Sequence, residues 1–135
     1  MNSKEYLGQA YRLNELIDSE IKELDELKSR RLSMESPKLD AIGKGSGVGA
    51  GAKYTYIIDK IIDLEEKINS EIDRYIDLKE ELRTAINQVE DADEQVILRS
   101  RYLNFMKWED IADYMNYSVQ HIFRLHKEAL NNFKR

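Results

Sequence analysis

Apolar residues recur along the first part of the chain at steps of three and four, the spacing of one helix face. Between residues 3 and about 34 this stripe consists of Tyr6, Ala10, Leu13, Ile17, Ile21, Leu24 and Leu27. The intervening positions are mostly Glu, Asp, Lys, Asn and Ser, which suit a solvated surface. The pattern predicts one long helix with a seam close to a heptad repeat.

A second stripe with the same steps follows between about Tyr54 and Glu90. It consists of Ile57, Ile61, Leu64, Ile68, Ile72, Tyr75, Leu78, Leu82, Ile86 and Val89. Residues 36–53 separate the two stripes and contain the single proline, Pro37, and five of the six glycines. Proline disfavours helix at the residue before it, and alternating glycines favour a flexible chain. The sequence therefore predicts a second long helix, joined to the first by a flexible linker.

Two helices of similar length on a flexible linker are expected to fold back antiparallel, so that each stripe buries the other. This pairing leaves Ile58, Ile62 and Ile76 at the edge of the seam. The excess apolar surface predicts a homodimer or a higher homo-oligomer formed through the helices.

The last part of the chain has shorter apolar segments with capping residues between them. Asp91 or Asp93 is a suitable N-cap for a helix. A helix is then predicted over 108–115, a turn at 116–118 and a last helix over 119–133. Asn116 belongs to the few residue types that tolerate a left-handed backbone, and Ser118 is a natural N-cap.

The spacing in this segment meets the demands of a helix-turn-helix. Ala112 is the small residue at which a second helix can cross, and Ile122 and Leu125 are two inward apolar residues three apart. The expected fold class is all-α, with an antiparallel coiled-coil hairpin over residues 1–91 and a helix-turn-helix domain over residues 92–135.

The charge is divided along the same boundary. The whole chain has a formal net charge of -5. Residues 1–91 hold 14 basic and 20 acidic residues, whereas residues 92–135 hold 7 basic and 6 acidic ones. The acidity therefore belongs to the hairpin and does not oppose binding of a polyanion by the C-terminal segment.

Composition excludes several classes of function. There is no cysteine, which fits a reducing cytoplasm and excludes thiolate metal sites. His121 and His126 are five residues apart, which does not match a zinc pair on a helix, so no metal site is predicted. Paired acids such as Glu65-Glu66 lie on lysine-rich faces without a nucleophile, and neither an enzyme nor a small-molecule substrate nor a cofactor is expected. No apolar run approaches the roughly 18 residues of a membrane span, and no signal peptide is expected.

One run of the C-terminal segment resembles region 4 of sigma-70 type factors, namely VILRSRYLNFMKWEDIADYMNYSVQHIFRLHKEAL. The matching residues are Leu98, Arg101, Tyr102, Trp108, Glu109, Ile111, Ala112, Ser118, Ile122, Leu125, Ala129 and Leu130. The resemblance covers about residues 93–133. Lys107 departs from the pattern, because the residue before that helix is often Ser or Thr, and the other promoter-reading sigma regions are absent.

The acidic hairpin before this segment makes the chain similar to small phage and prophage regulators of the RinA and ArpU type. That resemblance implies transcription control by sequence-specific binding to double-stranded DNA, in the cytoplasm of a bacterial host.

The expected DNA contacts come from the start of the last helix, which in such domains enters the major groove. Gln120 is suited to adenine and Arg124 to guanine, because each presents two hydrogen-bonding groups. Lys127 is expected at a phosphate, and Phe123 or Val119 at a thymine methyl group. The predicted DNA-binding residues are Arg99, Arg101, Ser118, Val119, Gln120, His121, Phe123, Arg124 and Lys127.

Two aromatic residues favour a structural role. Tyr102 and Trp108 suit stacking on single-stranded bases, but at this spacing they are expected in the core. His126 is expected to pack or to face water.

Two other functions fit the same pattern. A region-4-like unit can hold RNA polymerase or another protein in place of DNA. A small subunit of a phage DNA-packaging terminase also combines a helix-turn-helix with helical oligomerisation, although there the DNA-binding unit commonly comes first.

Overall fold

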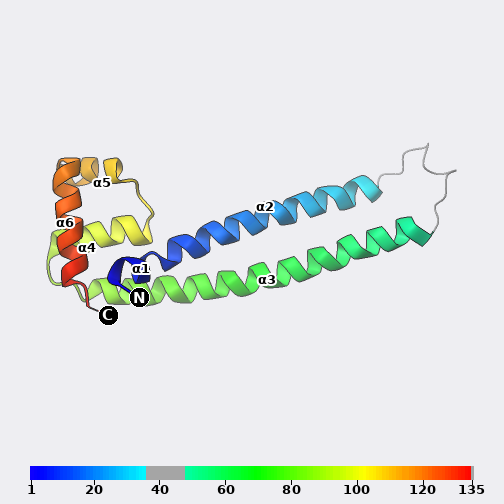
Figure 1. Cartoon of the computed structure of the whole chain (residues 1–135), viewed down its shortest axis with the longest axis horizontal. Coiled ribbons are helices and arrows are strands. Elements are labelled where there is room, and N and C mark those ends of the chain that lie inside the picture. The colour runs from blue at the N-terminus through cyan, green and yellow to red at the C-terminus, as the bar shows by residue number, and fades with distance from the viewer. Residues whose placement is uncertain (36–47, 135) are drawn as a thin grey trace. The chain divides into compact units, whose positions relative to one another are not determined.

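The computed structural model describes residues 1–35 and 48–134, and in these ranges it contains helices and no strand. The elements are α1 (Ser3–Leu7), α2 (Gln9–Glu35), α3 (Val48–Asn87), α4 (Ala92–Leu98), the π-helical turn η2 (Arg99–Leu103), α5 (Trp108–Met115) and α6 (Val119–Asn132) (Figure 1). The predicted all-α fold class is confirmed. Most of the predicted linker, residues 36–47, lies outside the described residues.

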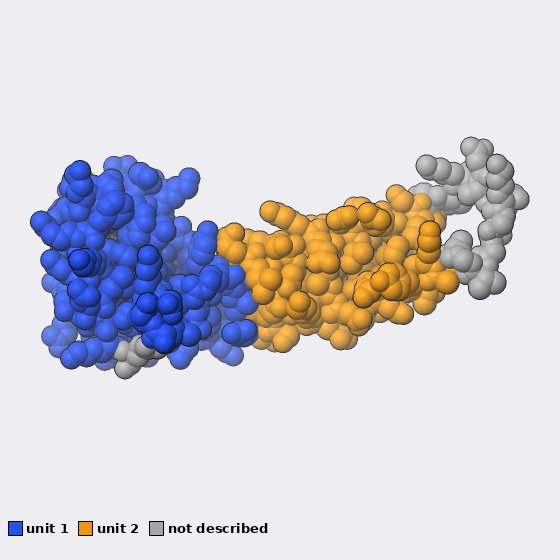
Figure 2. Space-filling view, in the orientation of Figure 1, with its two compact units in different colours: residues 1–14, 74–135 blue, residues 15–73 orange. Residues whose placement is uncertain are grey.

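The chain divides into two compact units (Figure 2). Unit 1 comprises residues 1–14 and 74–135, and unit 2 comprises residues 15–73. Because α2 and α3 contribute to both units, the two units do not coincide with the segments 1–91 and 92–135. The predicted domain boundary at residue 91 stays a prediction.

Unit 2 consists of parts of α2 and α3 that run in opposite directions. Lys67 Nζ lies 3.3 Å from Glu20 Oε1, and Lys28 Nζ lies 3.6 Å from Glu65 Oε2. Most of the apolar stripe residues are turned away from solvent, since Ile17, Leu24, Ile61 and Ile68 are buried, but Ile21 of the predicted stripe is 37% exposed. The predicted stripes therefore supply the buried faces of this unit.

Unit 1 gathers residues from both ends of the chain around an apolar core. The buried members are Leu7, Ala10, Leu82, Ile86, Leu98, Tyr102, Leu103, Ala129 and Phe133. The C-terminal helices thus share a core with the N-terminal turn α1 and the end of α3. Burial of this apolar area is the main source of their stability.

The predicted single helix over residues 3–34 is wrong at Gly8, where α1 ends. Gly8 N donates to the Lys4 carbonyl oxygen, and Arg12 Nη2 donates to the Glu5 carbonyl oxygen at 2.7 Å. A Cβ atom at Gly8 would lie 2.9 Å from Arg12 Nη1. The absence of this atom lets the arginine side chain cover the break.

The predicted start of the second helix at Tyr54 is also wrong, because α3 begins at Val48. The last residues of the predicted linker are therefore helical. Each residue added to an existing helix gains a backbone hydrogen bond, which favours extension of α3 into this segment although its glycines disfavour helix. At its other end α3 stops at Asn87, three residues before the predicted Glu90.

Over residues 1–35 and 48–134, no helix combines the length and the apolar character that a bilayer span requires.

Candidate nucleic-acid interface

The turn between α5 and α6 is built by two residues with special backbone roles. Asn116 ends α5 in the left-handed conformation, with φ 60° and ψ 40°. Tyr117 N then donates to the Ala112 carbonyl oxygen at 3.0 Å. Ser118 begins α6 by accepting a hydrogen bond at Oγ from His121 N at 3.1 Å. The predicted roles of Asn116 and Ser118 are confirmed.

The N-terminus of α5 has no comparable cap. Lys107 occupies the N-cap position with an extended backbone, φ -72° and ψ 153°, and its side chain makes no capping hydrogen bond. This agrees with the expectation that Lys107 is a poor cap. The first amide groups of α5 therefore lack a side-chain acceptor.

A small apolar cluster fixes the packing of α5 and α6. Ile97 of α4, Ile111 and Ala112 of α5 and Ile122 of α6 form its buried centre. Leu125, the other predicted inward residue, is half-buried and packs against the cluster. The small side chain of Ala112 is 4% exposed and admits close approach at this point.

Trp108 is surrounded on several sides by residues of the same unit. The guanidinium carbon of Arg101 lies 4.4 Å from the centre of its ring, at a distance typical of a cation–π contact. The rings of Phe123 and His126 approach it edge-on, with centroid distances of 5.5 and 4.5 Å. Trp108 thus packs as a structural residue, as expected.

The exposed face at the start of α6 holds most of the predicted contact residues. Ser118, Gln120, Phe123, Arg124 and Lys127 are exposed, and Val119 and His121 are half-buried. Phe123 is 48% exposed although it is a large apolar residue. This face therefore combines two cations, an amide and apolar surface within three helical turns, groups that match phosphates, base edges and thymine methyl groups.

The two arginines predicted on the preceding helix lie in η2 and are bound to protein groups. Arg99 Nη1 donates to Asn87 Oδ1 at 2.9 Å. Arg101 Nη1 donates to the Met106 carbonyl oxygen at 2.8 Å. Together with its contact to Trp108, this bond gives Arg101 a structural role in the loop before α5.

A chain of side-chain contacts leads from α4 to Arg124. Tyr117 Oη donates to Asp93 Oδ2 at 2.7 Å, which raises the pKa of the tyrosine because the phenol bonds to a carboxylate. The Tyr117 ring meets the His121 ring edge-on, with centroids 4.5 Å apart. Arg124 Nη2 in turn donates to His121 Nδ1.

A second polar pair lies inside unit 1. Tyr102 Oη and His126 Nε2 are 2.6 Å apart, and the two side chains are buried. Burial lowers the pKa of His126 to about 4 and raises the pKa of Tyr102 to about 12. The tyrosine is therefore protonated and the histidine neutral at neutral pH, and the tautomer of the ring sets which of the two groups donates.

Helix α5 carries charge of the opposite sign. Its exposed residues include Glu109, Asp110 and Asp113, and Tyr114 beside them is 69% exposed. Acids near its start are favourable for the helix dipole. The outward side chains of α5 therefore suit a different partner from those of α6.

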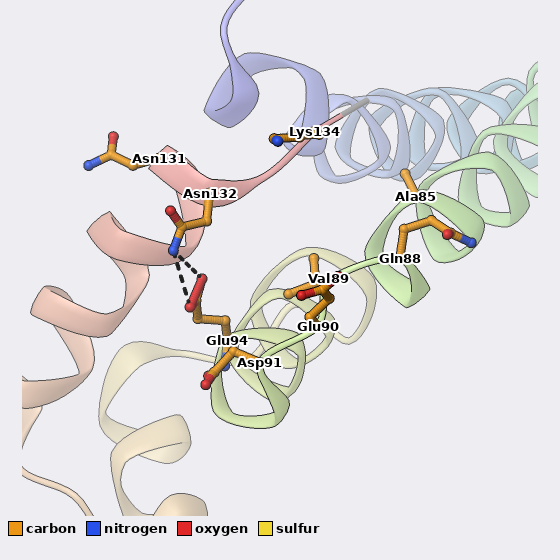
Figure 3. Close-up of a pocket in the computed structure, with 9 residues that line it drawn as sticks. All are labelled: Ala85, Gln88, Val89, Glu90, Asp91, Glu94, Asn131, Asn132 and Lys134. Carbon is orange, nitrogen blue, oxygen red and sulfur yellow. Dashed lines mark hydrogen bonds between the residues drawn. The ribbon is translucent and has the colours of Figure 1, made fainter.

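A cavity of about 440 Å³ lies at the C-terminal end of α6 (Figure 3). Its lining includes Asp91, Glu94 and Asn132. Asn132 Nδ2 donates to Glu94 Oε1 at 3.1 Å, and Asp91 Oδ2 caps α4 by accepting from Glu94 N at 2.9 Å. The bond between Asn132 and Glu94 thus joins the end of α6 to α4, and Asp91 caps the start of α4.

Sequence reasoning missed two residues of this arrangement. Tyr117 was predicted only as part of the turn, and because it lies before α6 begins, helical spacing gave no signal for its ring contact with His121. Asp93 was considered only as a helix cap. Its bond to Tyr117 joins residues 24 apart in the sequence and has no local signal.

Comparison with curated proteins and with solved structures gave no match. A family model with the description "Protein of unknown function (DUF1492)" matches residues 31–134, which include the end of α2 and all of α3, α4, η2, α5 and α6. The match covers well over half of the chain, and the chain belongs to this family.

Proposed function

We propose that this chain is a sequence-specific DNA-binding transcription regulator of phage or prophage type, acting in the bacterial cytoplasm. In this proposal α5 and α6 form a helix-turn-helix of the sigma-70 region 4 type, and α6 enters the major groove. The observation that carries the proposal is the left-handed Asn116 between two helices packed through Ala112, with exposed Gln120, Arg124 and Lys127 on the second helix.

The contacts follow from the chemistry of the exposed face. Gln120 pairs with adenine and Arg124 with guanine, each through two hydrogen bonds. Lys127 and the N-terminus of α6 with Ser118 bind phosphate oxygens. Phe123 covers a thymine methyl group.

The remaining predicted residues have supporting roles. Val119 and His121 border the exposed face of α6. Arg99 binds a phosphate oxygen in place of Asn87 when DNA is bound. Arg101 holds the loop before α5 through Met106 and Trp108.

Dimerisation through an α2–α3 hairpin raises the affinity of a weakly binding unit. One helix-turn-helix with a few phosphate contacts binds weakly, and two linked copies gain from their effective concentration. Support comes from α3, where Ile62 and Ile76 are 48% and 59% exposed. Two copies match paired half-sites on the duplex.

The acidic side of α5 supports a second candidate function, the binding of RNA polymerase or another protein. Glu109, Asp110 and Asp113 repel a nucleic acid but suit a basic protein surface, and the exposed Tyr114 is a residue type enriched in protein interfaces. A pull-down of RNA polymerase that survives nuclease treatment distinguishes this function from DNA binding.

The salt dependence of DNA binding tests the proposal. The affinity for duplex DNA is measured by fluorescence anisotropy between low and moderate salt. The magnitude of the slope of log affinity against log salt is expected to be about 0.9 per phosphate contact. Lys127→Ala removes one such contact and should therefore reduce the magnitude of the slope by about 0.9. The matched control is Lys22→Ala, an exposed lysine of unit 2, which should leave the slope unchanged. Equal slopes for wild type and Lys127→Ala would remove Lys127 from the interface.

A further inference from the structure

Arg124, the residue proposed to bind guanine, is held by a neighbouring side chain. Its Nη2 donates to Nδ1 of His121, one helical turn earlier. A guanidinium has only donors, so the histidine nitrogen must be the acceptor. His121 is therefore neutral in this arrangement and carries its proton on Nε2.

His121 is in turn held from the side by Tyr117. The rings meet edge-on, with an interplanar angle of 77° and centroids 4.5 Å apart. Tyr117 is itself anchored, because its hydroxyl donates to Asp93 Oδ2 at 2.7 Å. The contacts thus run from Asp93 at the start of α4 through Tyr117 and His121 to Arg124, all within unit 1.

An exposed arginine that is held in place binds differently from a free one. A free arginine side chain loses conformational freedom when it contacts a base, and this cost lowers affinity. A guanidinium fixed before binding avoids part of the cost and presents its donors in a defined direction. Since one Nη2 hydrogen is used by His121, the other donors of the group remain for the base.

We propose that His121 and Tyr117 are positioning residues that orient Arg124 toward one base pair and thereby determine specificity at that position. The inference rests on the proposed function, because it assumes that Arg124 reads DNA. It adds a role for two residues that do not themselves contact the base read by Arg124.

A double-mutant cycle with full-length protein tests the inference. A site selected from a random duplex pool and the same site with the critical base pair changed are titrated with wild type, His121→Ala, Arg124→Ala and the double variant. Arg124→Ala should reduce affinity for the selected site about tenfold and abolish the preference. His121→Ala should reduce the affinity for the selected site about fivefold. The affinity of the double variant should lie within about twofold of that of Arg124→Ala.

Conservative variants separate positioning from folding. His121→Gln keeps an acceptor for the guanidinium and should recover most of the preference. Tyr117→Phe keeps the ring contact and loses only the bond to Asp93, so about a twofold loss is expected. The thermal midpoint of each variant is measured alongside. Loss of preference that follows the thermal midpoint, or independent effects of His121→Ala and Arg124→Ala, would overturn the inference.

The failure of the function and the failure of the inference have different outcomes. If wild type binds every duplex equally, the proposed function and the role in specificity both fail. If wild type prefers one site and the cycle shows no coupling, only the positioning role fails. The nitrogen chemical shifts of His121 in the free protein check the contact without DNA, because the inference requires an unprotonated Nδ1. A protonated Nδ1 would contradict it.

Discussion

The hydroxyl oxygen of Tyr102 lies 2.6 Å from Nε2 of His126, and the two side chains are buried. The bond joins η2 to α6, so it fixes the helix proposed to read DNA against the helix that precedes α5. His126 also contacts Trp108, with ring centroids 4.5 Å apart. Burial favours the neutral form of this histidine, because a charged ring would lose its hydration.

The pH dependence of stability should reveal this pair. Unfolded histidine has a pKa of about 6.5, whereas in the folded protein burial lowers the pKa of His126 to about 4. The stabilisation is therefore complete above about pH 6.5 and is lost as pH falls toward 4, because the unfolded state binds the proton first. The loss should reach at most about 3 kcal/mol.

Urea unfolding at a series of pH values between 7.5 and 4 measures this effect. His126→Gln should show a smaller drop in the free energy of unfolding than wild type. Tyr102→Phe retains the buried histidine and should retain the drop, while losing about 1 kcal/mol at every pH. Identical pH profiles for wild type and His126→Gln would show that His126 is not buried in its neutral form.

A side-chain cap at the start of α5 should stabilise the protein. Lys107 already has the extended backbone of an N-cap but makes no capping bond. Serine at this position accepts a hydrogen bond from the first turn, so Lys107→Ser should raise the free energy of unfolding by about 1 kcal/mol. The reverse case is Ser118→Ala, which removes the cap of α6 and should lower the free energy of unfolding by a similar amount. Thermal melting of the two variants provides the test, and a destabilised Lys107→Ser would contradict the assignment.

The left-handed turn residue sets a third expectation. Asn116 has φ 60°, so Asn116→Ala should destabilise by about 1 kcal/mol, whereas Asn116→Gly should be neutral or slightly stabilising. Urea midpoints that fall equally for alanine and glycine would mean that the asparagine side chain, and not the backbone, is required.

The sequence predicted best what depends on local chemistry. Asn116 and Ser118 were assigned correctly because the residue type itself favours the observed backbone. Phe105 shows where prediction from residue type fails. Its φ is also positive, 56°, although bulky residues such as phenylalanine disfavour a positive φ. Its ring packs against Tyr11, with centroids 5.5 Å apart, and lies below Lys79 Nζ at 5.1 Å.

Contacts between distant segments explain the other differences. Tyr102 and His126 are 24 residues apart, and no periodicity of the sequence connects them. The π-helical turn η2 was not predicted, because its residues have ordinary helical character. For the candidate site, helical spacing placed the contact residues of α6 on one helix, but the partners of Arg99 and Arg101 required the tertiary structure.

A buried charge in unit 2 offers a fourth prediction. The Glu20 side chain is 7% exposed, its Oε1 lies 3.3 Å from Lys67 Nζ, and among the described residues Oε2 has no hydrogen-bond partner. Removal of a buried carboxylate avoids its desolvation cost, so Glu20→Leu should raise the free energy of unfolding by about 1 kcal/mol. Lys67→Ala leaves the carboxylate without its cation and should lower the free energy of unfolding. A urea midpoint that falls for Glu20→Leu would show that the ion pair stabilises the fold.

Selection of bound duplexes from a random DNA pool, at low and at moderate salt, tests the central claim most directly. If α6 reads DNA, wild type should enrich one sequence, and the enrichment should survive moderate salt because base contacts carry it. Arg124→Ala should lose the preference at one base pair but still bind duplex DNA at low salt through its phosphate contacts. Absence of any enriched sequence with folded wild-type protein would contradict DNA reading and favour a protein partner.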